Sequence, residues 1–385
     1  MKIAFVYDAI YPWVKGGIEK RVWELAVRLS RNGHEVHLFG MKFWDGEDIL
    51  IIDGVVLHGV CPAQKLYSDG RRSIWQALYF SIHLIFPLMR EKFDIIDCQQ
   101  FPYFSCFSAK ISSILNKIPL VITWHEIWGD YWYDYIGWKG IFGKITERLV
   151  ARLTSDNIAV SKTTAKNLNK LGIPAGIKII PNGVDLENIK SISPSTVSSD
   201  VIFAGRLIKE KNVDLLLHAF NLVLTEHPNH VLVIIGDGPE KDAVTTLIYT
   251  LNLGDNVRFI GFREFHGEII AYMKSSKICV LPSTREGFGI TALEALASGL
   301  PVVTIDHMAN AICDLITNDN GFLSSLSADD LASKILLGLS HYAEMRNACI
   351  LSADSSDWNQ ITADIESYYL SVIAHKKPMS KRKTN

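Results

Sequence analysis

The sequence of 385 residues lacks the signatures of several protein classes. Its net charge is only −2, so it carries no overall basic signature for nucleic acid. No short repeat runs through it, which excludes collagen-like and coiled-coil proteins. Its apolar content of 48% excludes a disordered chain, because such chains hold too little apolar surface to offset the entropy lost on folding. Its six cysteines form no CxxC pair, which favours buried, reduced thiols in a cytosolic protein.

Long hydrophobic runs are also missing. The first apolar run ends at Asp8, which does not fit a secretory signal peptide. The longest apolar stretch, Ile74–Met89, is interrupted by Gln76, His83 and Pro87. A membrane-spanning helix needs about 20 apolar residues. We therefore expect no transmembrane span.

Two nucleotide-binding motifs are absent. Gly16 and Gly17 follow the first apolar run, but they are not part of a GxGxxG pattern, and no suitable GxxxxGK[ST] occurs. This argues against a dinucleotide-dependent oxidoreductase and against a P-loop enzyme. The histidine pairs have no Cys or carboxylate cage in the sequence, so we interpret them as non-metal residues. They are His34 with His37 and His227 with His230.

Short apolar runs alternate with amphipathic segments along most of the chain. This alternation predicts an α/β protein with mostly parallel sheets. In the first half we expect strands at 2–7, 35–39, 55–60, 94–98, 120–123 and 157–160, and helices at 18–31, 74–90 (with a break at Pro87) and 140–153. After the Ser-rich segment 191–200 the pattern restarts, with strands at 201–204, 231–236, 257–260, 278–282 and 302–305, and helices at 214–224, 241–251, 269–275, 289–298 and 358–374.

Two successive sets of this kind imply two doubly wound, Rossmann-like domains. In such sheets, ligands bind beyond the carboxyl ends of the strands. Charge differs between the halves, because residues 1–200 carry a balance of +3 and residues 201–385 a balance of −5. Domains with different partners would explain this difference, and so would drift along the sequence.

The strongest motif follows the predicted strand 278–282. It reads Thr284-Arg-Glu286-Gly287-Phe288-Gly289 and opens a helix that contains Glu294. Free backbone N–H groups and the dipole at a helix start favour an anion, and glycines let phosphate oxygens approach the backbone. Glu294 could accept hydrogen bonds from ribose hydroxyls. The alternative is an ordinary strand–turn–helix with two surface acids.

A second motif, Gly205-Arg206 with Lys211, lies between another predicted strand and helix. Two fixed cations there could neutralise a diphosphate leaving group as its charge develops. The alternative is a pair of solvated bases. The segment from Gly236 to Pro239 favours a tight structural turn after a strand, and a direct contact with the ligand is the alternative.

Two features of the first half indicate a function less strongly than the motifs of the second half. His125 follows a predicted strand, where its imidazole would face a ligand, although most single histidines are structural. The segment 130–140 (DYWYDYIGWKG) is dense in aromatic residues. Aromatic side chains beside bases suit a membrane interface or stacking on sugar rings, and a basic tail would add attraction to anionic lipid. A packed aromatic cluster with a disordered tail is the alternative.

Five short motifs in this order and spacing resemble those of glycosyltransferase family 4, retaining enzymes of the GT-B fold. The likeness runs from Met1 to about Leu370. The motifs are Gly16-Gly17-Ile-Glu19, Pro181-Asn-Gly-Val-Asp185, Gly205-Arg206 with Lys211, Gly236-Asp-Gly-Pro239, and Glu286 with Glu294.

The resemblance implies two domains that face each other across a cleft holding a nucleotide-sugar. It implies an N-terminal acceptor domain over 1–188, joined by a helix at 357–375 that crosses back onto it. It further implies a nucleotide-sugar domain over 189–356, followed by a basic tail at 376–385.

The resemblance also implies roles for single residues. Arg206 and Lys211 should hold the diphosphate, Glu294 the ribose, and Glu286 the donor sugar, with His125 near that sugar. Further donor contacts should come from Gly16, Gly17, Gly205, Gly236, Phe262, Gly287, Phe288 and Gly289. The family needs no divalent metal, and this chain shows two bases, and no DxD, where a metal–diphosphate site would lie.

One segment departs from the family pattern. Where the family often has Gly-Gly and then Glu before the last strand, this chain reads Met308-Ala-Asn-Ala-Ile-Cys-Asp314. That loop commonly touches the donor, so the departure leaves the sugar open.

The sequence therefore predicts a metal-independent hexosyltransferase with no cofactor. Its donor is a UDP- or GDP-linked sugar, and its acceptor hydroxyl belongs to a lipid-linked or surface glycan precursor. We expect it in the cytoplasm, with peripheral contact at the inner face of the cell membrane, and no nucleic-acid partner. Two alternatives are a nucleotide-sugar epimerase on the same fold and a catalytically silent sugar-nucleotide-binding subunit.

Overall fold

The computed structural model describes residues 1–68, 71–173 and 176–376. The chain forms two compact units, of which the first holds residues 1–182 and those from 358 onward, and the second holds 183–357. The predicted boundary at 188/189 falls inside the short helix α7 (Leu186–Ser191), and the Ser-rich segment 191–200 leads into a strand of the second unit. Of the predicted basic tail, residues 377–385 lie outside the described residues.

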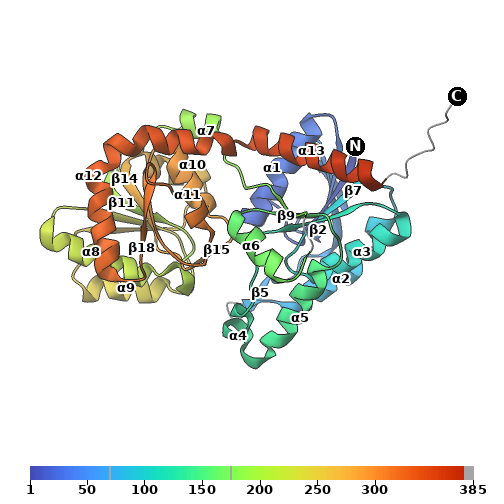
Figure 1. Cartoon of the computed structure of the whole chain (residues 1–385), viewed down its shortest axis with the longest axis horizontal. Coiled ribbons are helices and arrows are strands. Elements are labelled where there is room, and N and C mark those ends of the chain that lie inside the picture. Colours follow the sequence, from blue (N-terminus) through green and yellow to red (C-terminus); the bar gives the residue numbers. More distant parts are fainter. Residues whose placement is uncertain (69–70, 174–175, 377–385) are drawn as a thin grey trace. The chain divides into compact units, whose positions relative to one another are not determined.

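The first unit is built on an eight-stranded sheet with the order β10-β9-β8-β7-β1-β2-β4-β3 (Figure 1). Its strands are parallel except β3, which runs antiparallel to β4. The strands are β1 (Lys2–Val6), β2 (Glu35–Lys42), β3 (Ile49–Ile52), β4 (Val55–Pro62), β7 (Ile95–Gln99), β8 (Leu120–Trp124), β9 (Asn157–Ala159) and β10 (Lys178–Ile179); a separate two-stranded sheet holds β5 (Tyr67–Ser68) and β6 (Arg71–Arg72).

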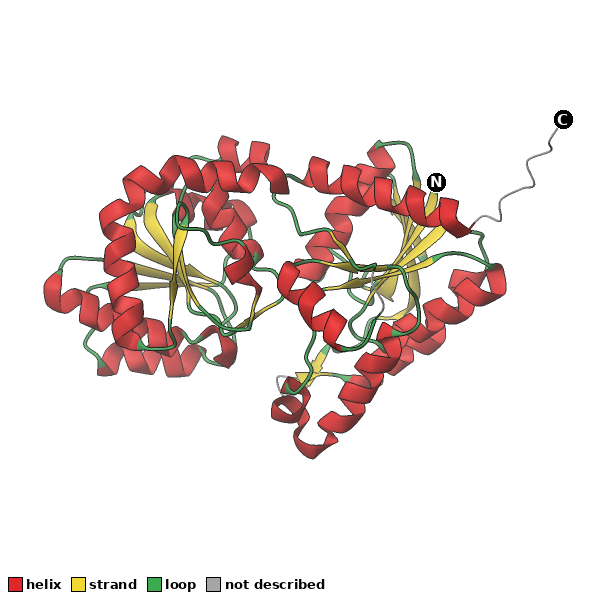
Figure 2. Cartoon of the chain, in the orientation of Figure 1, coloured by secondary structure: helices red, strands yellow, loops and turns green. Residues whose placement is uncertain are grey.

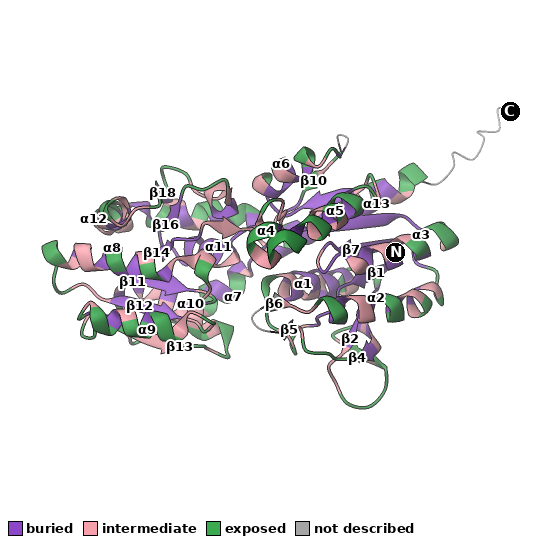
Figure 3. Cartoon of the chain, turned by 90° about the horizontal axis from the view of Figure 1, so that it is seen from below, coloured by how far each residue is buried: buried purple, intermediate pink, exposed green. Residues whose placement is uncertain are grey.

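Helices cover both faces of this sheet, because successive strand residues point to opposite sides (Figure 2). Ile3 and Phe5 of β1 pack with the first and last helices of the unit, whereas Ala4 and Val6 pack on the other side. Both cores are largely buried (Figure 3). The helices are α1 (Gly17–Arg31), α2 (Ile74–Met89), α3 (Phe104–Asn116), α4 (Tyr131–Ile136), η1 (Gly137–Lys139), α5 (Gly140–Ala151), α6 (Lys162–Lys170) and α13 (Trp358–Lys376).

The second unit has a six-stranded, fully parallel sheet with the order β13-β12-β11-β14-β16-β18. A parallel sheet needs helical crossovers, and these bury its apolar strands on both faces. The strands are β11 (Ser199–Ala204), β12 (Leu232–Ile235), β13 (Val257–Gly261), β14 (Ser276–Leu281), β16 (Val302–Ile305) and β18 (Gly321–Ser324). The helices include η2 (Lys209–Lys211), α8 (Val213–Glu226), α9 (Lys241–Thr250), α10 (His266–Lys274), α11 (Ile290–Ala297) and α12 (Ala328–Ala353).

Some elements differ from the sequence-based expectation. The predicted break at Pro87 was wrong: α2 continues to Met89, because Pro87 lies in the last turn, where only one backbone hydrogen bond is lost. The helices α3, α6 and α12 had not been predicted. In α12 the buried positions are interrupted by polar and small residues, so its apolar periodicity is weak. Among the described helices, none combines the length and apolarity that crossing a bilayer requires.

Candidate active site

In the second unit, the predicted donor residues gather at one edge of the sheet. Because β11 to β14 are parallel, their carboxyl ends lie together. Arg206 follows β11, Gly236 follows β12, Phe262 follows β13, and Glu286 lies in the loop after β14. Arg206 and Phe262 are exposed there, so both side chains face solvent at this edge.

Two glycines allow neighbouring strand ends to approach closely. Gly236 has φ +150°, and a Cβ atom on it would lie 1.9 Å from the carbonyl oxygen of Gly205. No L-amino acid side chain fits that space without moving the backbone. The two glycines that the sequence placed at the donor site are therefore a pair that sets the spacing of β11 and β12.

The loop after β11 is tied to the loop after β14. The Asn212 side-chain amide donates to the Pro282 carbonyl at 2.8 Å, and the Thr284 amide donates to the Glu210 carbonyl at 3.0 Å. Lys211 forms an ion pair with Glu286, and their side chains are only 14% and 26% exposed. The structure thus joins two residues that the sequence had assigned to diphosphate and sugar.

The glycine-rich turn after Glu286 opens α11. Gly289 is the residue before this helix and has φ +91°, a conformation that favours glycine. A Cβ atom there would lie 2.4 Å from Cγ1 of Ile312. Phe288 is buried, and its side chain anchors the turn that carries Gly287.

The segment that departs from the family pattern lies beside Glu286. The short strand β15 (Arg285–Glu286) pairs in parallel with β17 (Ala309–Asn310), which places Glu286 opposite Asn310. Asn310 is fully buried, and its side-chain amide donates to the Ile305 carbonyl at 2.8 Å and to Thr304 Oγ1 at 2.9 Å. Met308 is 81% exposed on this segment. Sequence reasoning had missed this pairing, because strands of two residues leave no periodic signal.

Glu294 does not point freely to solvent. It is buried on α11, and one carboxylate oxygen lies 2.8 Å from Nε2 of His266. His266 begins α10, shortly after Phe262 in the chain, and its side chain is 43% exposed. Sequence reasoning had missed His266, and its position just beyond a strand end was the available signal.

In the first unit, Gly16, Gly17 and His125 belong to the corresponding edge of the other sheet. The loop after β1 carries the glycines, and His125 follows β8. His125 is buried and lies 2.8 Å, through Nε2, from Oε1 of Gln99, while its backbone amide donates to Oε1 of Gln100 at 2.9 Å. Burial, reinforced by the charge of Arg21, lowers the pKa of His125 well below its usual value. The imidazole is therefore neutral, and Nε2–H donates to Gln99.

Two buried carboxyl groups near the glycine loop had been given no role, although Glu19 belongs to the first family motif. Asp8 follows β1 and accepts from Arg72 at 2.5 Å and from Gln76 at 2.7 Å. Glu19 lies in the first turn of α1, and its Oε2 is 2.4 Å from where a Cβ atom on Gly16 would be. Burial raises the pKa of Glu19 to about 7, and the negative charge of Asp8 adds to that rise.

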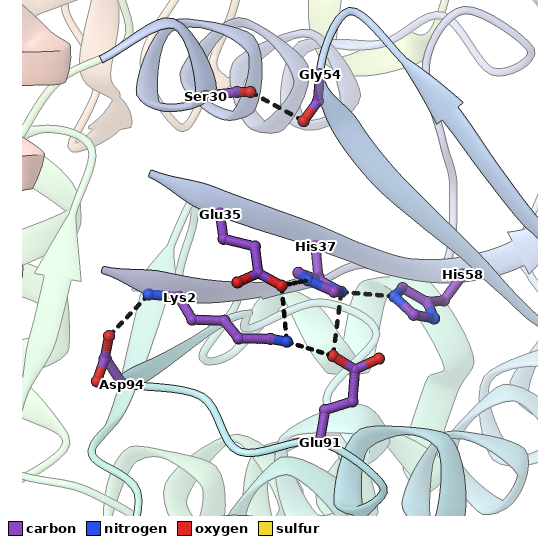
Figure 4. Close-up of polar contacts among 8 residues, drawn as sticks. All are labelled: Lys2, Ser30, Glu35, His37, Gly54, His58, Glu91 and Asp94. Atoms are coloured by element: carbon purple, nitrogen blue, oxygen red, sulfur yellow. Dashed lines mark hydrogen bonds and ion pairs between the residues drawn. The ribbon is translucent and has the colours of Figure 1, made fainter. Parts of the chain in front are cut away.

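A third polar cluster lies near the amino ends of β1 and β2 (Figure 4). His37 Nδ1 is 2.8 Å from His58 Nε2, and with Glu91 these side chains offer three ligand atoms within 4.8 Å of one another. Such a group could hold a metal ion. The sequence had supplied no carboxylate cage for His37, and the fold provides one. The ammonium group of Lys2 already brings a positive charge to this cluster, because Lys2 Nζ lies 2.6 Å from Glu91 and 2.7 Å from Glu35.

Comparison with known proteins identifies the family. Residues 15–188 match Glycosyltransferase Family 4, and residues 186–355 match Glycosyl transferases group 1. The chain belongs to glycosyltransferase family 4. The family resemblance seen in the sequence motifs is thus confirmed.

Curated relatives of this glycosyltransferase have varied names. It is 33% identical over 328 residues to a glycogen synthase of Mycobacterium tuberculosis, covering 79% of this chain and 80% of the relative. It is 25% identical to the phosphatidylinositol N-acetylglucosaminyltransferase gpi3 subunit of Schizosaccharomyces pombe (88% and 73% covered). It is also 25% identical to alpha-monoglucosyldiacylglycerol synthase of Streptococcus pneumoniae (88% and 76% covered).

Solved structures confirm the predicted fold class. Sucrose-phosphate synthase from Thermosynechococcus elongatus matches with a TM-score of 0.82 and 20% identity, covering 97% of this chain and 99% of that one. HepE from Anabaena, solved in complex with UDP-glucose, matches with a TM-score of 0.74 and 20% identity, covering 96% and 100%. The glycosyltransferase has the GT-B fold, with two Rossmann-like domains.

Proposed function

We propose that this glycosyltransferase transfers a hexose from a nucleotide-diphosphate sugar to an acceptor hydroxyl, with retention of anomeric configuration. The observation that carries the proposal is the pairing of Lys211 with Glu286 at the sheet edge where Arg206 also lies. Two cations at one edge suit a diphosphate, whose charge grows as the glycosidic bond breaks. Glu286 is then placed for the sugar attached to that diphosphate.

Other side chains support this assignment. Glu294 is buried one turn into α11, and its carboxylate suits two ribose hydroxyls, with His266 as the neighbour that holds it. His125 is neutral, so it acts in this proposal by hydrogen bonding near the donor sugar and not as a proton carrier at neutral pH.

The transfer is proposed to need no metal or other cofactor. Arg206 and Lys211 supply the positive charge that a divalent ion would otherwise bring to the diphosphate. The cluster of His37, His58 and Glu91 lies near the amino ends of its strands and takes no part in this scheme.

Donor and acceptor are proposed from the relatives. HepE was solved with UDP and with UDP-glucose, which supports a UDP-linked hexose, and a GDP-linked donor remains the alternative from the sequence. Two relatives are named for phosphatidylinositol and for diacylglycerol, which supports a lipid-linked or surface glycan precursor as acceptor. Such an acceptor would be met at the cytoplasmic face of the cell membrane, by peripheral contact.

A binding experiment tests the donor site. A thermal-shift panel of nucleoside diphosphates and their sugars should raise the melting temperature with UDP or GDP, since a ligand that binds only the folded state stabilises it by mass action. Glu294→Ala should weaken nucleotide affinity about tenfold or more, as loss of hydrogen bonds to a charged group does. Glu344→Ala, an exposed position on α12, is the matched control. Unchanged affinity in Glu294→Ala would remove the ribose role.

Measurements of turnover distinguish glycosyl transfer from the epimerase and from the silent binding subunit. Arg206→Ala should lower turnover by at least 100-fold, on the order of the loss when one oxyanion-type stabiliser is removed. Conversion of the donor without any acceptor into an isomeric sugar nucleotide would indicate an epimerase. Absence of both transfer and donor hydrolysis, with intact nucleotide binding, would indicate a silent binding subunit.

A further inference from the structure

A pocket of about 450 Å³ lies within the first unit, and none of its lining residues is among those assigned to the donor. Its walls come from the start of α2, the segment that enters α3, and the helices α4 and α5. Most lining side chains are aromatic or aliphatic. The lining residues are Arg72, Ser73, Ile74, Ala77, Phe101, Pro102, Tyr103, Phe104, Trp132, Tyr135, Ile136, Phe142, Gly143 and Thr146.

The pocket offers little to a polar ligand. Arg72 is its single charged lining residue, and its guanidinium is already paired with the buried carboxylate of Asp8 at 2.5 Å. Ser73 accepts from the backbone amide of Gln76 as the cap of α2, and the Thr146 hydroxyl donates to the Phe142 carbonyl at 2.9 Å. The Tyr103 hydroxyl donates to Glu147 and the Tyr135 hydroxyl accepts from the Arg72 amide, whereas Trp132 Nε1 is buried without a hydrogen-bond partner among the described residues. The rest of the lining is mostly hydrocarbon, which suits an apolar ligand.

The helix that forms one wall is built like an interfacial helix. Along η1 and α5, exposed apolar side chains recur at three- to four-residue spacing and so share one face; they are Trp138 (74% exposed), Ile141, Phe142, Ile145 and Leu149. The same segment carries three basic residues, Lys139, Lys144 and Arg148, and Arg152 follows it. Lys144 forms an ion pair with the exposed Asp130, and the segment's single acid, Glu147, is buried. An apolar face with tryptophan and flanking bases is typical of a helix that lies on an anionic lipid surface.

The wall that α2 contributes has the same character. The helix α2 contains no charged residue, and it exposes Ile74, Trp75, Ile82 and Phe86 to solvent, with Trp75 70% exposed. Monomeric soluble proteins rarely expose apolar side chains along a whole helix. Both walls of the pocket therefore end in surfaces that suit lipid.

Lining residues of the pocket are connected to the ligand edge of the sheet. Phe101 to Phe104 line the pocket, and they follow directly on Gln100, whose side chain accepts from the His125 amide. Arg72 connects the pocket to Asp8 at the end of β1. A chain seated in the pocket would thus leave its polar head at the edge that holds His125 and the Gly16 loop.

We propose that this pocket holds a hydrocarbon chain of the lipid acceptor while the α5 face rests on an anionic membrane. The inference rests on the proposed function, because it assigns the acceptor's apolar part to a site of its own. Its occupant is the acyl or isoprenoid chain of a membrane lipid.

Binding of alkyl chains tests the pocket without any donor. The full-length protein is titrated with n-alkyl glucosides from hexyl to decyl, below their micelle concentrations, in competition with the fluorescent fatty acid cis-parinaric acid. Affinity should rise about fourfold per added methylene, the equivalent of ~0.8 kcal/mol, until the pocket is filled. Equal affinity across the series would overturn the proposal.

Two variants reduce the volume of the pocket. Thr146→Phe and Ala77→Leu should each weaken decyl glucoside binding at least tenfold. Thr245→Phe is the matched control, because Thr245 is exposed on α9 and makes the same hydroxyl bond to the carbonyl four residues earlier. If all three variants bind decyl glucoside alike, the pocket is not the site.

Vesicle flotation and nucleotide binding separate the possible failures. With vesicles of phosphatidylcholine and 30% phosphatidylglycerol, the wild type should float, and the variant Lys144→Gln/Arg148→Gln should float several-fold less. No flotation of the wild type would overturn the membrane part. UDP and GDP should stabilise Thr146→Phe as they do the wild type. If neither nucleotide binds any variant while alkyl binding persists, the proposed function fails and the pocket assignment stands as a lipid site.

Discussion

Lys211 and Glu286 form an ion pair in the second unit, although 75 residues separate them in the chain. The pair exists because two loops that follow neighbouring parallel strands are joined by a backbone hydrogen bond and by the Asn212 side chain. Each side chain is therefore held by the other. In the proposed donor site a bound diphosphate would compete with Glu286 for Lys211, so the ion pair offers a measurable test of donor binding.

Removing either partner should have opposite effects on nucleotide affinity. Glu286→Gln removes a negative charge beside the diphosphate, so UDP or GDP should bind as tightly as to the wild type or several-fold more tightly, while turnover of the donor sugar falls at least tenfold. Lys211→Met should weaken nucleotide binding at least tenfold, since a charge-assisted bond is lost. Isothermal titration calorimetry and initial rates measure both. Weaker nucleotide binding in Glu286→Gln would contradict the competition.

The turn before α11 depends on glycine at position 289. Gly289→Ala should destabilise the second unit by about 1–2 kcal/mol from its positive φ alone, and the contact with Ile312 adds to this. Because Ile312→Ala removes that contact, the double variant should lose less stability than the sum of the single variants. Hydrogen exchange of the α11 amides measures the change. Gly254→Ala is the control, since nothing lies within 4 Å of a Cβ atom there, and strict additivity would exclude the contact.

Glu19 should make stability depend on pH near neutrality. Its folded pKa of about 7 lies above the unfolded value of 4.5, so the protonated form stabilises the fold fully below pH 4.5, and this contribution is lost as pH rises through 7. Glu19→Gln should therefore be more stable than the wild type at pH 8, by about 3 kcal/mol, and equal to it near pH 4. All nine tryptophans lie in the first unit, so their fluorescence follows its unfolding alone. A difference independent of pH would contradict the assignment.

His58 should make stability depend on pH in the direction opposite to that of Glu19. Burial, and then the nearby His37, lower its pKa to about 4, while Glu91 opposes and Lys2 adds to that shift. The folded state then binds fewer protons than the unfolded state, so stability falls as pH drops from 6.5 towards 4. His58→Gln should remove about 2 kcal/mol of this loss at pH 4.5. Tryptophan fluorescence during urea unfolding measures it, with exposed His341→Gln as the control, and a slope equal to that of the wild type would refute it.

The packing of the last helix, α13, on the first unit should be stabilised by one buried hydroxyl. Tyr369 on α13 is fully buried and donates to Asp97 of β7 at 2.5 Å, across 272 residues of sequence. Burial raises the pKa of Asp97, and Tyr369 and Thr123 counter that rise by hydrogen bonding. Tyr369→Phe should destabilise the first unit by about 1.5–3 kcal/mol, as loss of a bond to a charged group does. Tyr249→Phe, at an 84% exposed position, should change nothing in the same urea titration.

Much of the architecture follows from local patterns. The apolar runs at β1, β11 and β12 are short and flanked by turn residues, so residues near in sequence are enough to predict these strands. Elements with weak periodicity, such as α12 and β15, could not be predicted from their own residues, because contacts with the rest of the chain decide them. A two-residue strand such as β15 forms because β17 lies beside it and not because its own residues favour it.

The residue pattern alone predicts the parallel alternation of strands and helices, the glycine turns, and the types of residue at the strand ends. The pairing of side chains follows only from the folded chain: Glu286 with Lys211, Glu294 with His266, His37 with His58, and His125 with Gln99. The reason is physical. Helix and strand preferences act within a few residues, whereas partners are set by the order of strands in a sheet, which the burial of the whole chain selects.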